Sequence, residues 1–192
     1  MSNETKLRED ICRFGRSLFE RGLTPGSSGN ISVKLADGGW LVTPTNASLG
    51  FLDPARLSHL DAQGRLVSGD APTKEVPLHA ALYETRNAAG AIVHLHSTHS
   101  VAISMLPEID PRAALPPMTA YYLMKCGATA LVPYFRPGDP AVADASRGLP
   151  ENTHRCCSPI TARWSPATRW RPRCSRRRSW RKQRSCICCC GG

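Results

Sequence analysis

Apolar residues recur at helical spacing near the start of the chain. Leu7, Ile11, Phe14 and Leu18 follow one another at intervals of four, three and four residues, which places them on one face of a helix. The residues between them are mostly charged, and Asn3 stands where a helix cap is expected. The pattern predicts an amphipathic helix that starts at Asn3 and ends near residue 22.

An alternating pattern follows this helix. Ile31, Val33 and Leu35 occupy every second position after the loop TPGSSGN, and the turn ADGG leads into the apolar run WLVT. The segment LDAQGRLV has the same form, with a turn between two short apolar stretches. Two β-hairpins are therefore predicted in this part of the chain.

Helical and strand patterns alternate over the rest of the body. VPLHAALYETR, SVAISML and AVADASRGL are predicted helices; Pro77 lies in the first turn of the first, and Ser97 or Thr98 can cap the second. GAIVHLH and ATALVPYF are predicted strands. A chain of 192 residues fits one domain, so we expect an α/β fold in which helices cover a sheet.

Charge and cysteine divide the chain near Leu149. Residues 1–150 contain 14 Lys+Arg and 14 Asp+Glu, whereas residues 151–192 contain 11 Lys+Arg and one acidic residue. Seven of the nine cysteines also lie past residue 150, in a stretch with neither helical nor strand periodicity. We therefore expect a domain over residues 1–149 and a basic tail over 150–192. The net charge of +10 belongs to the tail and does not indicate that the body binds nucleic acid.

The N-terminus and the hydropathy pattern bear on location. The segment MSNETKLRED is polar where a signal peptide would be apolar, and no apolar run is long enough to span a bilayer. The body carries only Cys12 and Cys126, as a reduced cytosolic protein would. We expect a cytoplasmic protein with no membrane partner.

The segment VHLHSTHS places three histidines close together. Residues two apart on a strand project from the same face, so His94 and His96 would present two imidazoles side by side, as Zn²⁺ requires. His99 falls after the strand and is not expected to join them. A pair of hydrogen-bonded histidines on a half-buried strand would give the same pattern without a metal.

Further candidate groups lie upstream. Glu75 begins a predicted helix, whose N-terminal dipole stabilises a carboxylate; it could ligate a metal, act as acid or base, or be a helix-terminal charge of no further use. The loops GSSGN, TPTNAS and PTK are rich in Gly, Ser and Thr, whose amides and hydroxyls cradle phosphate, although such loops are also ordinary turns.

These segments together carry a family resemblance. GSSGNIS, LVTPTN, PTKE and VHLHSTHS, in this order and spacing, resemble the class II aldolase and adducin family, and the match covers nearly all of residues 5–149. TKE and LPPMTAYYLMKCGATALVPY are most similar to the 3-oxo-tetronate 4-phosphate decarboxylases of that family. The resemblance implies a three-layer α/β/α sandwich with a largely antiparallel sheet, and a homotetramer.

The resemblance also implies a site. Its Zn²⁺ is bound by three histidines, of which His94 and His96 match two, and Glu75 matches the acid/base carboxylate. Tyr121 matches a tyrosine that reaches a neighbouring subunit's site, with Tyr122 as the alternative. The positions that match the substrate and phosphate loops are Gly29, Asn30, Thr45, Asn46, Thr73 and Lys74.

The implied reaction is the decarboxylation of 3-oxo-tetronate 4-phosphate to dihydroxyacetone phosphate and CO₂. Zn²⁺ bound to the enediolate would stabilise its charge as a Lewis acid, and Glu75 or Tyr121 would donate the proton. Lys74 would bind the departing carboxylate or the phosphate. The alternatives are a fuculose-phosphate type of aldolase, which forms the same enediolate, and an adducin-like binding module without catalysis.

The family's third zinc histidine lies in an Asn-His-Gly-Pro-like segment that is absent from this chain. Permissible codons for Cys157 to Arg163, read from the third base of the first codon, encode Leu-Ala-Asn-His-Gly-Pro. We infer that residues after Leu149 are out of frame through a single-base deletion, either in the gene or in its sequencing, and expect them to be disordered, with the chain impaired. The alternative is a genuine basic arm that binds nucleic acid or, through thiolates, a metal.

Overall fold

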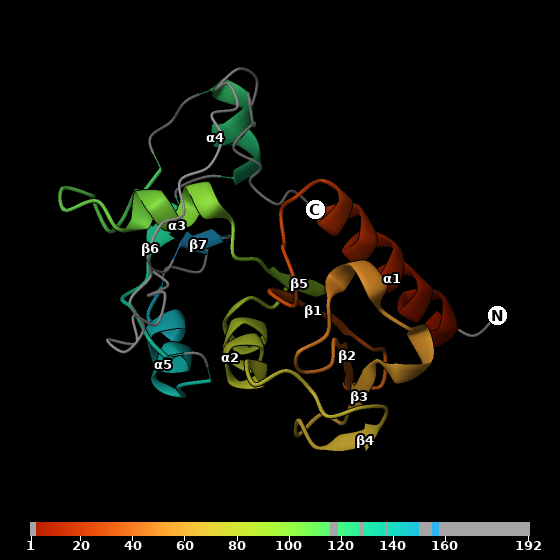
Figure 1. The fold of residues 1–192 in the computed structure, drawn as a ribbon. Helices are drawn as coiled ribbons and strands as arrows, with labels where there is room; N and C mark the ends of the chain where they lie inside the picture. The colour runs from red at the N-terminus through yellow and green to blue at the C-terminus, as the bar shows by residue number, and fades with distance from the viewer. Residues whose placement is uncertain (1–2, 116–118, 127–128, 137, 150–154, 158–192) are drawn as a thin grey trace, which may run out of the picture.

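The computed structural model describes residues 3–115, 119–126, 129–136, 138–149 and 155–157 of the chain (Figure 1). The N-terminal part contains α1 (Asn3–Glu20), β1 (Asn30–Lys34), β2 (Trp40–Val42), the short helices η1 (Leu49–Phe51) and η2 (Pro54–Arg56), β3 (Ser58–Leu60) and β4 (Leu66–Ser68). The later part contains α2 (Val76–Thr85), β5 (Ala91–His94), α3 (Thr98–Ser104), α4 (Ala120–Cys126), β6 (Thr129–Leu131), α5 (Ala141–Arg147) and β7 (Arg155–Cys157).

Five strands form an antiparallel sheet in the order β4-β3-β2-β1-β5. The two predicted hairpins, β1-β2 and β3-β4, are confirmed as neighbours in this sheet. The edge strand β5 arrives from much later in the chain and pairs with β1, so that Asn30 lies opposite His94 and Ser32 lies opposite Ile92. This pairing joins the GSSGN loop to the histidine segment.

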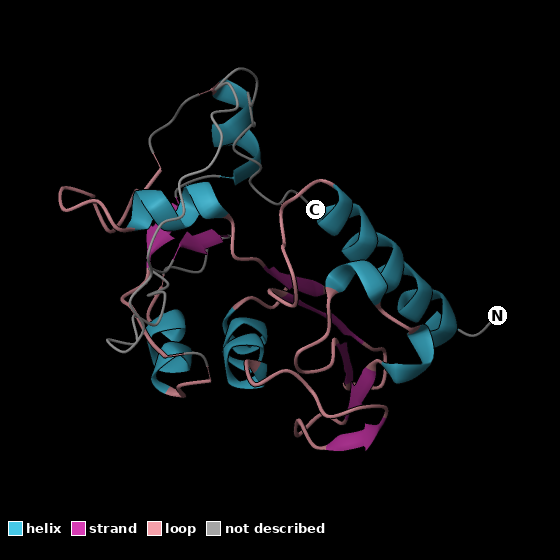
Figure 2. Ribbon diagram, viewed as in Figure 1, coloured by secondary structure: helices cyan, strands magenta, loops and turns pink. Residues whose placement is uncertain are grey.

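Helices cover both faces of the sheet, as Figures 1 and 2 show with α1 on one side and α2 on the other. The α1 face buries an apolar cluster of Ile11, Ile31, Leu41, Leu49 and Leu57. On the α2 face Trp40, Val42, Leu60 and Tyr83 form a second cluster. The alternation of side chains along β2 supplies both clusters, because Leu41 points to one face and its two neighbours to the other. The predicted three-layer α/β/α arrangement with a largely antiparallel sheet is confirmed.

The remaining elements lie beyond α2 and β5 (Figure 2). β6 and β7 pair in parallel, with Thr129 opposite Arg155. α5 packs beside α2, where Arg147 forms an ion pair with Glu84 at 2.7 Å. Helix α4 was not predicted from the sequence. Of the predicted tail, residues 155–157 form β7, and the rest of residues 150–192 lie outside the described residues.

One boundary corrects the sequence prediction. The predicted strand GAIVHLH ends at His94, so His96 follows the strand and is not part of it. Strand geometry therefore does not by itself place the His96 imidazole on the same face as that of His94. The ring centroids of His94 and His96 nevertheless lie 5.0 Å apart, so the two imidazoles are side by side as predicted.

Candidate metal centre

The start of α2 and the end of β5 bring Glu75, His94 and His96 together. Glu75 is the N-cap residue of α2, His94 is the last residue of β5, and His96 follows two residues later. One oxygen or nitrogen of each side chain lies within 4.8 Å of those of the other two, and all three residues are half-buried. His99 is exposed and is not part of this cluster, as predicted.

The donor set of this cluster suits a divalent metal ion. Two imidazole nitrogens and one carboxylate oxygen are ligands that Zn²⁺ accepts at catalytic sites, where further positions remain for substrate or water. Glu75 Oε2 also accepts a hydrogen bond from His94 Nδ1. A metal ion held by these residues would take the place of that hydrogen bond.

Charge at the cluster is set by burial and by mutual contact. Burial of its carboxyl acts to raise the pKa of Glu75, but the hydrogen bond and positive charge of His94 and the amide of Asn30 outweigh it and lower the pKa to about 2. Burial, together with the charge of His94, lowers the pKa of His96. At neutral pH the cluster therefore offers an ionised carboxylate and a neutral His96 imidazole, the forms in which these groups ligate a metal.

Behind the cluster lies a buried polar network that the sequence analysis missed. Asn30 Nδ2 donates to Glu75 Oε2 at 2.7 Å, and Asn30 Oδ1 lies 2.5 Å from His79 Nε2. His79 Nδ1 lies 2.6 Å from Ser32 Oγ, which lies 2.9 Å from Tyr83 Oη. The signal was present, because Glu75, His79 and Tyr83 follow at intervals of four and so share one helix face.

The backbone at Gly29 passes very close to β5. Gly29 has φ +80°, and a Cβ built on it would lie 2.9 Å from the carbonyl oxygen of His94 and 3.0 Å from Thr24 Oγ1. Only glycine combines this conformation with this approach. Gly29 therefore serves to place Asn30 beside His94.

The other two predicted loops lie beside each other. The Thr45 amide donates to the Ala71 carbonyl at 2.9 Å, and the Thr73 amide donates to the Thr43 carbonyl at 3.2 Å. Thr73 Oγ1 also accepts from the Glu75 amide at 3.3 Å, so this loop runs directly into the cluster. Lys74 and Asn46 are exposed, and Asn46 has φ 58°.

The two tyrosines differ in burial. Tyr122 is buried, and its hydroxyl lies 2.7 Å from Thr129 Oγ1. Tyr121, on the same helix α4, is 70% exposed. Exposure thus separates the two tyrosines, and the role predicted for Tyr121 in a neighbouring subunit's site stays a prediction.

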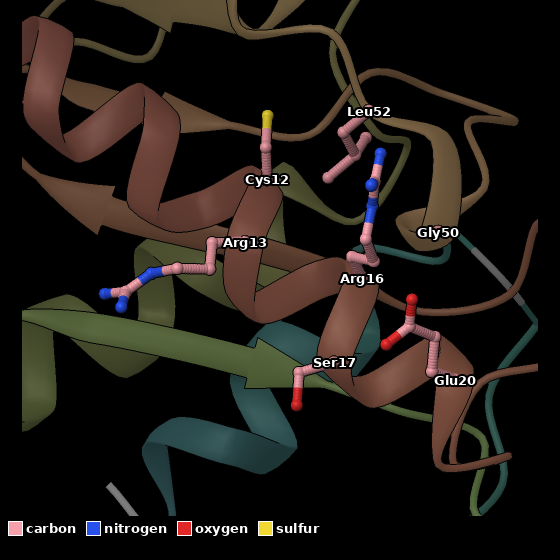
Figure 3. A pocket seen from close by; sticks show the side chains of 7 residues that line it. All are labelled: Cys12, Arg13, Arg16, Ser17, Glu20, Gly50 and Leu52. Carbon is pink, nitrogen blue, oxygen red and sulfur yellow. The ribbon is translucent and has the colours of Figure 1, made fainter.

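A pocket of about 410 Å³ lies elsewhere, along α1 and η1 (Figure 3). Its lining consists of Cys12, Arg13, Arg16, Ser17, Glu20, Gly50 and Leu52. Figure 3 shows the Arg16 side chain extending beside Leu52, whereas Arg13 points away. Burial and the nearby Asp53 raise the pKa of the Cys12 thiol to about 11, so it is not a reactive thiolate at neutral pH. The predicted site residues do not line this pocket.

The fold and this cluster define a member of a known family. Residues 9–157 match the Class II Aldolase and Adducin N-terminal domain, and the chain belongs to this family. The predicted resemblance is confirmed.

Individual relatives place the chain more narrowly. It is 54% identical over 143 residues to a 3-oxo-tetronate 4-phosphate decarboxylase of Cupriavidus necator, a match that covers 74% of this chain and 65% of that protein. It is 35% identical over 138 residues to an L-fuculose phosphate aldolase of Methanocaldococcus jannaschii, covering 71% of this chain and 72% of that protein. Both names describe lyases, in agreement with the predicted enzyme class.

A solved structure has the same fold. The crystal structure of YgbL from Klebsiella pneumoniae superposes with a TM-score of 0.79 and 44% identity, over 83% of this chain and 77% of that one. Within the described residues, the helices do not include one that is long and apolar enough to cross a membrane.

Proposed function

We propose that this protein is a zinc-dependent carbon-carbon lyase that decarboxylates 3-oxo-tetronate 4-phosphate to dihydroxyacetone phosphate and CO₂. The observation that carries the proposal is that Glu75, His94 and His96 each place one ligand atom within 4.8 Å of those of the other two. The name of the Cupriavidus necator relative supports the substrate class. A cytoplasmic location belongs to the same proposal, and Cys12 is a free thiol, as expected in a reducing compartment.

In the reaction, the bond to the carboxyl carbon breaks, CO₂ leaves, and the electron pair remains on the carbon next to the ketone until that carbon takes up a proton. A bound divalent cation would supply Lewis acidity for the charge that develops on the substrate oxygens. Glu75, His94 and His96 are the residues that would hold it. Asn30 and His94 keep Glu75 ionised, so in this state Glu75 serves as a ligand or as a base.

A proton donor is therefore needed in addition to ionised Glu75. We assign this role to Tyr121 of a neighbouring subunit in a homotetramer, since the Tyr121 side chain is exposed on α4. A tyrosine hydroxyl is protonated at neutral pH and can give up its proton to a carbanion. Deletion of this hydroxyl should lower turnover without changing metal content.

The loops beside the cluster would bind the phosphate and carboxylate of the substrate. Backbone amides around Gly29 and Asn46 and the Thr45 and Thr73 hydroxyls are suited to phosphate. The exposed ammonium of Lys74 lies next to Glu75 in the chain and would bind the departing carboxylate or the phosphate.

The C-terminal tail is part of the proposal. We infer that a single-base deletion after Leu149 replaced the family's third zinc histidine, and the family match that ends at residue 157 supports this inference. Without that histidine the chain keeps Glu75, His94 and His96, so we expect weak zinc binding and impaired turnover. Sequencing the gene on both strands tests the deletion; a gene with no missing base would exclude it.

A second candidate is cleavage of fuculose 1-phosphate, favoured by the 35% identity to the Methanocaldococcus jannaschii aldolase. The test compares the present chain with a version whose gene has the base restored, both purified with Zn²⁺. CO₂ release from 3-oxo-tetronate 4-phosphate and aldehyde release from fuculose 1-phosphate are measured on each. We expect the restored enzyme to release CO₂ much faster than aldehyde. Aldehyde as the main product would favour the aldolase, and no turnover of either substrate would refute both assignments.

A further inference from the structure

Four buried side chains connect the hydrophobic interior to Glu75. Tyr83 Oη, Ser32 Oγ, the two ring nitrogens of His79 and the amide of Asn30 follow one another at hydrogen-bonding distances of 2.5–2.9 Å. Ser32 and His79 are fully buried, and Asn30 and Tyr83 are 6% and 5% exposed. Buried polar groups are costly unless each finds a partner, so the network is ordered by its own hydrogen bonds.

The chemistry of the groups sets the direction of every hydrogen bond. An ionised carboxylate only accepts, so the Asn30 nitrogen faces Glu75 and its carbonyl oxygen faces His79. His79 Nε2 must then carry the proton that it donates to Asn30. The uncharged ring leaves Nδ1 as an acceptor, so the Ser32 hydroxyl donates to Nδ1 and the Tyr83 hydroxyl donates to Ser32. All four donors thus point toward Glu75.

We propose that His79 is a positioning residue for Glu75: its Nε2–H fixes the Asn30 amide with nitrogen toward the carboxylate, and thereby fixes the carboxylate in the metal cluster. This inference rests on the proposed function in one respect: the proposed function gives Glu75 its role as metal ligand or base. Without the His79 proton, the buried Asn30 carbonyl oxygen would lose its donor, and the amide would be held only by its hydrogen bond to Glu75. The amide would then no longer hold the carboxylate in one position.

Packing alone does not account for a histidine at this position. The neighbouring α2 residues Val76 and Ala80 pack against the apolar cluster of Trp40, Val42, Leu60 and Tyr83, and an aliphatic side chain would extend that cluster without desolvating a polar ring. The donor and acceptor of His79 are instead both used, each by a side chain of β1.

Two substitutions separate the donor and acceptor functions of His79. His79→Gln can keep an amide N–H near the Nε2 position and so can still donate to Asn30, whereas His79→Asn is too short to do so and keeps only an acceptor toward Ser32. Both are neutral amides of related size. Tyr83→Phe, at the far end of the network, is a control that leaves the His79–Asn30 contact in place.

The first readout is the affinity of the full 192-residue chain for Zn²⁺, measured by competition with a chelator after each variant is shown to melt cooperatively. Groups that orient metal ligands typically change affinity by about 10–100-fold when removed. We expect His79→Asn to weaken binding by at least about tenfold, and His79→Gln and Tyr83→Phe by less than about threefold. Equal affinities for His79→Asn and the parent chain, or equal losses in the Asn and Gln variants, would overturn the assignment.

The second readout requires neither metal nor substrate and so separates this inference from the proposed function. Nitrogen NMR of the metal-free parent chain should show His79 as the Nε2–H tautomer, and the Asn30 side-chain amide should exchange with solvent faster in His79→Asn than in His79→Gln. If the parent chain binds no Zn²⁺ but shows this tautomer and exchange order, the positioning role stands and the proposed function fails. The Nδ1–H tautomer, or equal exchange in both variants, would refute the positioning role whatever the metal result.

Discussion

Replacement of His79 by glutamine should change how the stability of this protein depends on pH. Burial of the ring, with a contribution from the charge of His94, lowers the pKa of His79 from its ordinary 6.5 to about 3. In the unfolded chain the same imidazole takes up a proton as the pH falls below about 6.5. Between these two values the unfolded state binds a proton that the folded state does not, so acid shifts the equilibrium toward unfolding.

The size of the effect follows from the two pKa values. The stabilisation is complete above the unfolded pKa of about 6.5 and is lost progressively as the pH falls toward the folded pKa of about 3. Between about pH 7 and about pH 4.5, His79 alone should reduce the free energy of unfolding by about 2.5 kcal/mol. Glutamine does not titrate, so the variant should lack this loss.

The assay is urea denaturation of both proteins at several pH values across this range, with the free energy of unfolding obtained by linear extrapolation. The titratable groups nearest to His79 are Tyr83 on its own helix and the Glu75–His94 pair beyond Asn30. Both proteins contain them, so their contributions cancel in the difference between the two curves. Curves that run parallel from pH 7 to pH 4.5 would show that His79 takes up its proton at the same pH in the folded protein as in the unfolded chain, and the uncharged ring assigned to the network would be wrong.

Three further predictions concern the glycine approach, the core and the substrate loop. Gly29→Ala should lower the free energy of unfolding by at least about 3 kcal/mol and abolish Zn²⁺ binding, because the new Cβ would meet the β5 backbone. The control Gly26→Ala, with φ +61° and no atom within 4 Å of the added Cβ, should lower it by only about 1–2 kcal/mol. Equal losses in chemical denaturation would contradict the close approach. Leu41→Ala, at a fully buried position, should lower the free energy of unfolding by about 2–5 kcal/mol. Val67→Ala, at a 61% exposed position, should lower it by less than about 1 kcal/mol. Thermal melts in which Val67→Ala is the less stable variant would contradict this assignment of the core. Lys74→Ser in the frame-restored enzyme should lower kcat/KM for decarboxylation by about 10–100-fold through loss of a charged hydrogen bond, and unchanged kinetics would remove Lys74 from the substrate site.

Local patterns in the sequence were sufficient to predict α1 and the two hairpins. The spacing of Leu7, Ile11 and Leu18 and the alternation of Ile31 and Val33 reflect which faces are buried. Phe14 was wrongly placed on the buried face of α1: it is 57% exposed, and Gly15 is buried beside it instead. Helix α4 was missed because its seven residues, AYYLMKC, carry no repeated polar face that would mark a surface helix.

The site was predicted only in part, because some of its contacts join segments that are far apart in the sequence. His94 and Glu75 could be nominated from their own neighbours, but Asn30 joins them only through the pairing of β1 with β5, which no local pattern reveals. His96 was predicted from strand geometry, but the strand ends at His94, two residues before it. His79 was overlooked because it stands among apolar residues of α2, and its role depends on which β1 side chains that helix meets.

The central claim is that Glu75, His94 and His96 together bind one divalent metal ion, and elemental analysis tests it most directly. The frame-restored protein, purified with Zn²⁺ and dialysed, is compared with its His94→Ala, His96→Ala double variant. We predict one equivalent of zinc per chain in the former and none in the latter. A restored protein without stoichiometric transition metal, or a double variant that keeps its full zinc content, would contradict the claim.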